Sequence, residues 1–86
     1  MTHTIKWNCP EWDGPETLDE ADTLKEALRL YALARKGVLL GEKQNARLVA
    51  CKRPETVVVW IEREGKAIQE GNLQKGLIRF YQHGQK

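Results

Sequence analysis

The chain has 86 residues, of which 41 % are hydrophobic and 30 % are charged, and its formal net charge is +2. A chain of this length supports one hydrophobic core, so we expect a single domain that covers residues 1–86. The longest apolar runs, Leu30–Ala34 and Val57–Ile61, have five residues each, which excludes a membrane-spanning helix, and the absence of serine excludes a serine nucleophile.

Alternating apolar side chains begin the chain and predict a short strand over Thr4–Cys9. We expect this strand at an edge of the sheet, because a short strand that pairs on one side only is tolerated there. Pro10 and the pair Gly14-Pro15 disfavour helical geometry, so a loop is predicted to follow.

A start signal, an apolar face and a stop signal predict the first helix. Two Thr-x-x-Glu patterns, which begin at Thr17 and Thr23, fit a capping box, and the acidic residues around them suit a helix N-terminus. Gly37 fits the left-handed position after a last turn, so we expect the helix to end at Lys36. The predicted apolar face consists of Leu24, Ala27, Leu28, Leu30, Tyr31, Ala32 and Ala34.

The most regular strand pattern covers Thr56–Arg63, where β-branched residues suit a pleated surface better than a helix. Its side chains alternate between two faces. The residues expected to pack against the helix are Val57, Val59 and Ile61. Val58 and Trp60 point the other way, so their face needs a second cover or a partner.

The remaining segments complete a predicted α+β fold. A strand over Arg47–Lys52 is expected to form a hairpin with the valine-rich strand, after a turn at Gly41–Asn45, and Ala67–Glu70 is expected to be extended. Leu73–His83 fits a helix better than a strand, because its apolar residues recur at helical spacing. We therefore predict a meander of three antiparallel strands with one long helix on one face, a second short C-terminal helix and a short N-terminal edge strand.

No motif predicts catalysis, a cofactor or a metal centre. A metal site would need His3, Cys9, Cys51 and His83, which are scattered and lack the close spacing of metal ligands. We interpret both cysteines as free thiols that pack in the core, with Cys51 in a strand. Because no apolar stretch of signal-peptide length follows Lys6, the expected location is the cytoplasm. Because no catalytic constellation is found, we do not expect an enzyme.

The charge is divided unequally along the chain and suggests a surface for a protein partner. Residues 11–26 contain seven acids and one base, a net charge of −6, whereas residues 27–86 contain twelve bases and five acids, a net charge of +7. We predict a small binding protein, an adaptor or inhibitor of a larger complex such as those encoded by phages and mobile elements. Its predicted contact residues are Glu16, Asp19, Asp22, Leu33, Val58 and Trp60.

Nucleic-acid binding is the alternative prediction. Basic residues gather at the predicted hairpin ends and on the predicted second helix, where they could contact phosphates. This basic surface consists of Lys52, Arg53, Arg63, Lys66, Lys75 and Arg79.

Residues 56–84 resemble the last strand and helix of HicA-like toxins. The shared positions are Gly65, Lys66, Ile68, Gly71, Leu73, Ile78 and Gly84. The resemblance implies a double-stranded-RNA-binding-domain fold and a helix at the C-terminus. That family cleaves RNA with a histidine that follows a Gly-Ser pair on its second strand, but this chain has Lys43-Gln44-Asn45-Ala46 there. RNA cleavage is therefore not implied for this chain.

Overall fold

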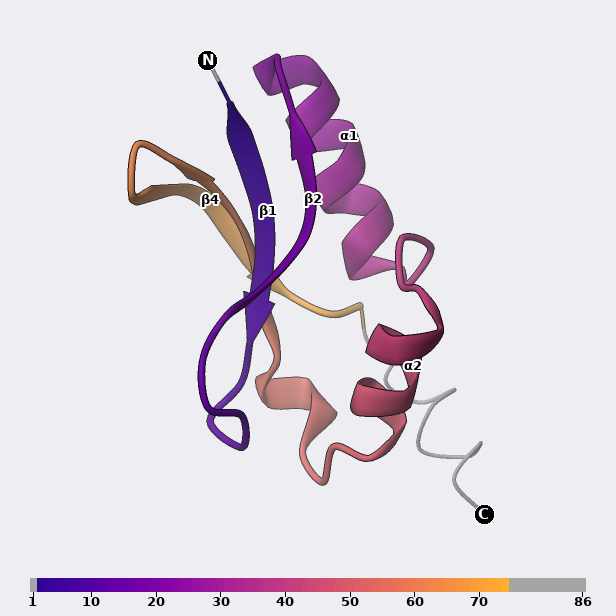
Figure 1. Ribbon diagram of the computed structural model, residues 1–86. Helices are drawn as coiled ribbons and strands as arrows, with labels where there is room; N and C mark the ends of the chain where they lie inside the picture. Colours follow the sequence, from indigo (N-terminus) through magenta and orange to yellow (C-terminus); the bar gives the residue numbers. More distant parts are fainter. Residues whose placement is uncertain (1, 75–86) are drawn as a thin grey trace.

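The computed structural model describes residues 2–74 as an α+β fold with four strands and two α-helices (Figure 1). The predicted helix over Leu73–His83 lies outside the described residues, apart from its first two positions. The elements in chain order are β1 (His3–Asn8), β2 (Glu16–Ala21), α1 (Leu24–Arg35), α2 (Glu42–Val49), the 3₁₀ turn η1 (Pro54–Thr56), β3 (Val58–Arg63) and β4 (Lys66–Asn72).

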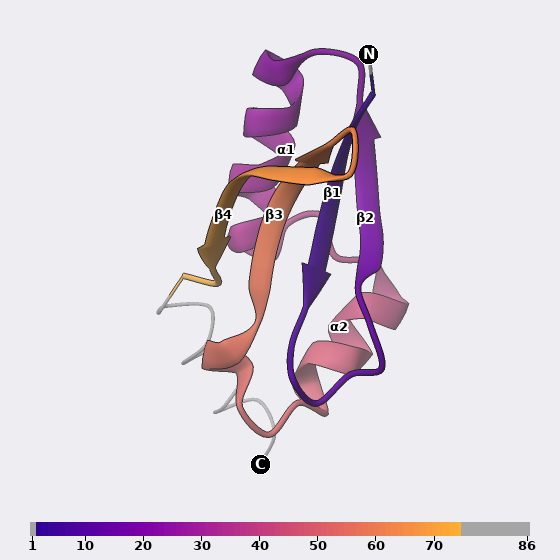
Figure 2. The ribbon, with the colours of Figure 1, turned by 90° about the vertical axis from the view of Figure 1, so that its left-hand side faces the viewer.

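The four strands form one antiparallel sheet in the order β2-β1-β3-β4. The α+β class is confirmed, but the predicted three-stranded meander is wrong. The N-terminal strand is also not an edge strand, because β1 pairs with β2 on one side and β3 on the other. Ile5 and Trp7 are fully buried on this strand, which suits a central position. Figure 2 shows the four strands in front of both helices.

Strand β2 replaces the predicted loop and the first of the two predicted helix starts. Thr17 pairs with Lys6 across the β1–β2 ladder, so the Thr17-x-x-Glu20 pattern is not a capping box. A register shift between Ile5 and Lys6 interrupts this ladder. Asp19 and Glu20 of β2 are exposed to water at the sheet edge, where charged side chains also discourage pairing with other chains.

Helix α1 begins and ends with the predicted signals. The Thr23 hydroxyl accepts a hydrogen bond from the Glu26 backbone N–H at 3.2 Å. At the other end, Gly37 has φ of +80°, and the Val38 N–H donates to the Leu33 carbonyl at 2.9 Å. These contacts form a Schellman motif, which satisfies carbonyls of the last turn.

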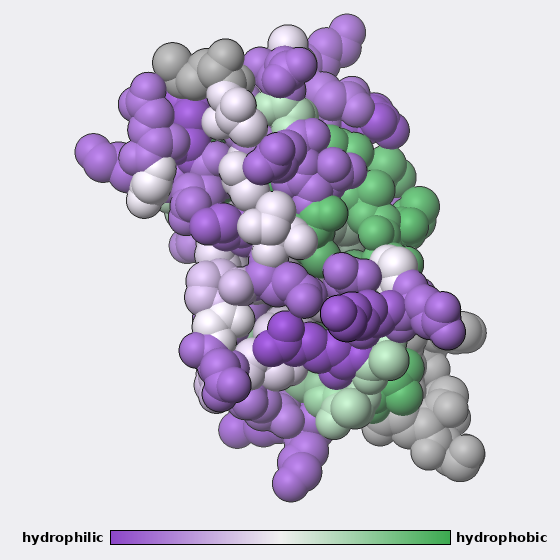
Figure 3. Space-filling model, in the orientation of Figure 1, coloured by the Kyte–Doolittle hydropathy of each residue, from purple (hydrophilic) through white to green (hydrophobic). Residues whose placement is uncertain are grey.

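The buried face of α1 is narrower than predicted. The residues that pack against the sheet are Ala27, Leu30, Tyr31 and Ala34. Leu24 and Leu28 were expected in the core but are 45 % and 43 % exposed. In Figure 3, a hydrophobic area lies over α1.

Helix α2 replaces the predicted turn at Gly41–Asn45 and the predicted strand at Arg47–Lys52. Leu48 is its one buried residue, so the apolar pattern that would reveal a helix is nearly absent. Cys51 therefore lies in the loop after α2 rather than in a strand, and η1 leads the chain into β3.

The two faces of β3 differ as the sequence predicts. Val57, just before the strand, and Val59 and Ile61 within it are fully buried, and α1 packs against β3. Val58 and Trp60 point to the opposite face and are half-buried. No helix among residues 2–74 covers this second face, which we call the open face (Figure 2). Within the same residues, no helix has the length and apolar character needed to cross a membrane.

Candidate functional site

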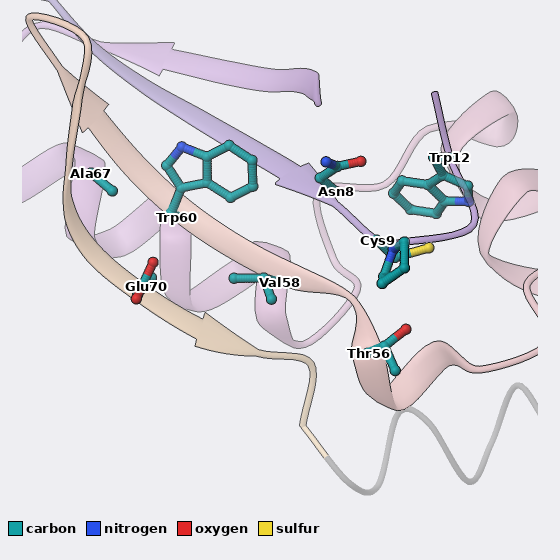
Figure 4. A pocket seen from close by; sticks show the side chains of 9 residues that line it. Asn8, Cys9, Trp12, Thr56, Val58, Trp60, Ala67 and Glu70 are labelled. Atoms are coloured by element: carbon teal, nitrogen blue, oxygen red, sulfur yellow. The ribbon is translucent and has the colours of Figure 1, made fainter. Parts of the chain in front are cut away.

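A groove with a volume of about 510 Å³ lies on the open face (Figure 4). Strands β3 and β4 supply its long walls, while the end of β1 and the loop after it close one end. The lining residues are Asn8, Cys9, Pro10, Trp12, Thr56, Val58, Trp60, Ala67 and Glu70. A concave and largely apolar surface with a few polar groups is the usual form of a binding site.

Trp60 occupies a central position on the open face. It pairs with Lys6 of β1 and with Glu70 of β4, so it stands between these two charged residues. Its half-buried indole gives the groove a large apolar surface together with a polar N–H group. Tryptophan in such a position is a frequent anchor of protein interfaces.

Two polar groups of the groove lack partners among the described residues. The side-chain oxygen of Asn8 is buried and accepts no hydrogen bond from residues 2–74. The Glu70 carboxylate is exposed at the opposite wall and makes no recorded ion pair with that part of the chain. Of these two acceptors, Glu70 is the one exposed to a ligand, so the groove is suited to a ligand that brings positive charge.

The open face is acidic. Cross-strand register places four charged residues on it, and they are Lys6, Glu20, Glu62 and Glu70, a net charge of −2. The single base is already paired, because Lys6 Nζ lies 2.8 Å from Glu62 Oε2. The hydrogen bond from Lys6 lowers the pKa of Glu62 below its ordinary value of 4.5.

The structure does not bring the predicted protein-contact residues together on one surface. Val58 and Trp60 line the groove together. Glu16 and Asp19 lie on β2 at the far edge of the sheet, and Asp22 lies in the turn before α1. Leu33 was expected to be exposed, but it is half-buried on α1.

The predicted basic surface is also divided. Lys52 and Arg53 precede η1, whereas Arg63 and Lys66 flank the turn between β3 and β4. The six residues of β3 separate these pairs by about 20 Å. Lys75 and Arg79 lie outside the described residues.

Sequence reasoning missed the end of the groove formed by Pro10 and Trp12. The centres of the Trp12 and Trp7 rings lie 4.9 Å apart. The guanidinium of Arg47, which belongs to α2, lies 4.4 Å from the centre of the Trp12 ring. These contacts join the β1–β2 loop to the core and to a helix that the sequence did not predict. No local pattern marks Trp12 as a neighbour of this groove.

Beside this end of the groove, the fold brings two cysteines and a carboxylate together. The Sγ atoms of Cys9 and Cys51 lie 3.9 Å apart, and Cys51 Sγ lies 3.1 Å from Glu11 Oε2. Both cysteines are buried and free, as predicted. Sequence spacing gave no sign of the cluster and left out Glu11.

Electrostatics keep the Cys51 thiol protonated. Burial and the hydrogen bond to Glu11 raise the pKa of Cys51 to about 12. The pKa of Glu11 is lowered, chiefly because its carboxylate accepts the backbone N–H of Lys52 at 3.0 Å. The Arg53 N–H also donates to it, at 2.9 Å. The carboxylate is therefore held in place by the loop that carries Cys51.

Comparison with protein-family models, with curated proteins and with solved structures finds no match to this chain. The function is therefore argued from the groove and its chemistry.

Proposed function

We propose that this chain is a non-enzymatic, cytoplasmic protein-binding module, an adaptor or inhibitor, whose groove binds a segment of a partner protein. The segment carries an apolar side chain that packs against Trp60 and Val58, next to a lysine or arginine. The observation that carries this proposal is the half-buried Trp60 in an apolar groove that no described helix covers.

The exposed carboxylate of Glu70 specifies the partner's charge. A lysine or arginine of the partner would pair with this carboxylate at the wall of the groove. The apolar anchor supplies affinity, while the ion pair fixes the orientation of the segment.

The acidic open face favours a protein over a nucleic acid. A phosphate backbone is attracted by unpaired lysine and arginine side chains, and its affinity falls as salt rises. On the open face, Lys6 is paired with Glu62, and Glu20 and Glu70 would repel phosphates. The nucleic-acid alternative rests on the two separated basic pairs at the ends of β3.

Selection from a displayed library of random short peptides tests the proposal. We expect enriched peptides to combine an aromatic or large aliphatic residue with a neighbouring lysine or arginine. Trp60→Ala should weaken their binding by at least about tenfold, because truncation of an interface tryptophan is costly. Glu70→Lys should weaken it as well, through charge repulsion.

Ile68→Ala is the matched control, because Ile68 is an exposed apolar residue of β4 that does not line the groove. Its peptide affinity should equal that of the unmodified protein. Enriched peptides that bind Trp60→Ala normally, or that lose binding only with Leu28→Lys on the exposed flank of α1, would overturn the proposal. Tight, salt-sensitive binding of duplex RNA without any peptide binding would favour the alternative.

A further inference from the structure

Three metal-ligand side chains converge from two loops that are distant in the sequence. Cys9 and Glu11 belong to the loop after β1, and Cys51 follows α2. One sulfur from each cysteine and one oxygen of Glu11 all lie within 4.8 Å of one another. Nothing in the local sequence requires this arrangement, because the two cysteines lie 42 positions apart in the sequence.

We propose that Cys9, Glu11 and Cys51 form a binding site for a single Zn²⁺ ion. Two thiolates and a carboxylate are zinc ligands, and three protein ligands leave a fourth position for water. This inference rests on the cluster alone and stands whether or not the groove binds a peptide.

The spacing of the two sulfurs fits the proposed ion. Tetrahedral zinc with Zn–S bonds of about 2.3 Å places two thiolate sulfurs about 3.8 Å apart. The Cys9 and Cys51 sulfurs are 3.9 Å apart, so they already have this separation. Zinc can therefore enter with a small movement of the side chains.

The surroundings hold the third ligand in position. The Glu11 carboxylate accepts backbone N–H bonds from Lys52 and Arg53, as outer hydrogen bonds orient ligands in known metal sites. Glu11 is exposed whereas both cysteines are buried. The ion thus has a path from solvent, and the fourth position faces water.

Zn²⁺ binding releases protons and neutralises part of the negative charge of its ligands. Each Zn–S bond replaces an S–H bond, so two protons leave to solvent, and no electron is transferred. Two thiolates and the carboxylate carry a charge of −3, which Zn²⁺ reduces to −1. The side chains of Lys52 and Arg53 supply positive charge in the same loop.

The bound ion would hold together the two loops that form one end of the groove. It would join the loop that carries Pro10 and Trp12 to the loop that leads into Thr56, and all three residues line the groove. A ligand that binds only the folded chain raises its stability, so Zn²⁺ should raise the melting temperature.

Titration of the reduced, metal-free full chain with Co²⁺ and Zn²⁺ tests the site. We expect one Co²⁺ per chain with a thiolate-to-metal charge-transfer band, and displacement of Co²⁺ by Zn²⁺ should abolish the band. Cys9→Ala and Cys51→Ala should abolish both the band and the rise in melting temperature. Circular dichroism of each variant establishes that it is folded.

Glu11→Gln keeps the test decisive if a cysteine variant fails to fold, because Glu11 is exposed. It should weaken Zn²⁺ binding by at least about tenfold, whereas Glu55→Gln, on an exposed neighbouring glutamate, should leave the affinity unchanged. No charge-transfer band in the folded protein, or equal affinity for Zn²⁺ in the Glu11→Gln protein, would overturn the proposal.

Discussion

The indole N–H of Trp7 donates a hydrogen bond of 2.8 Å to Oε1 of Glu16 and joins the central strand β1 to the edge strand β2. Trp7 is fully buried, so this bond satisfies a polar group that has left water. The second oxygen of the same carboxylate lies 3.4 Å from Nη1 of Arg47 on α2. One partly exposed glutamate therefore connects both strands to a helix.

Removal of this carboxylate should lower the free energy of unfolding. Glu16→Ala leaves the buried indole N–H without a partner, which costs about 1–3 kcal/mol. Glu16→Gln retains an acceptor and should cost less. Urea denaturation measures both values, with Thr17→Ala on the same exposed edge as a control that stays within about 0.5 kcal/mol. If Glu16→Ala costs the same in a Trp7→Phe background, the hydrogen bond is not the cause.

A side chain at Gly37, in the turn after α1, should lower the stability of the fold. Its φ of +80° is a left-handed conformation, so Gly37→Ala should destabilise the fold by about 1–2 kcal/mol. Gly14→Ala is the control, because a Cβ there meets nothing within 4 Å and φ is not positive. Thermal unfolding of both variants makes the comparison, and equal melting temperatures would contradict the Schellman motif.

The Lys6–Glu62 pair should contribute to the pH dependence of stability. The folded-state pKa of Glu62 is lowered, so the contribution is present above its ordinary pKa of 4.5 and is lost as pH falls through the folded-state value. Glu62→Gln should therefore reduce the loss of stability below about pH 4.5. Denaturation across a pH series measures this slope. In a Lys6→Met background the same substitution should have a smaller effect, because Trp60 is then the remaining group that lowers the pKa of Glu62. An undiminished effect would show that Lys6 is not the main cause of the lowered pKa.

The Cys51 thiol should react slowly with alkylating reagents. Burial and Glu11 raise its pKa to about 12, and the thiolate is the reactive species. Mass spectrometry of the metal-free protein at mildly alkaline pH should show slower alkylation of Cys51 than in the urea-unfolded chain. Glu11→Gln should accelerate the reaction, because it removes a contact that favours the protonated form. A folded protein that is alkylated as fast as the unfolded chain would refute the buried position.

Local signals predicted some elements of this fold and misled about others. The alternation around Val59 predicted β3 and its two faces, because burial on one side of a strand leaves a period of two. Thr23 and Gly37 predicted the ends of α1 through backbone hydrogen bonds that involve nearby residues. Thr17 begins a sequence pattern typical of a helix cap but lies in a strand, because the choice between strand and helix there depends on pairing with β1.

The candidate sites were less predictable than the fold. Val58 and Trp60 could be recognised as a face that needs a cover, since the pattern is local to one strand. The contact between Cys9 and Cys51 depends on how the α2 loop packs against the end of β1, and no spacing in the sequence encodes it. Trp12 reaches the groove for the same tertiary reason.

Nuclear magnetic resonance of the three indole N–H groups tests the central claim most directly. A peptide selected for binding should shift the indole signals of Trp60 and Trp12, which line the groove, and leave that of Trp7 nearly unchanged, since it is buried against Glu16. A saturating peptide that leaves Trp60 unshifted and instead perturbs the amides around Leu24 and Leu28 would place the binding surface on α1 and contradict the account.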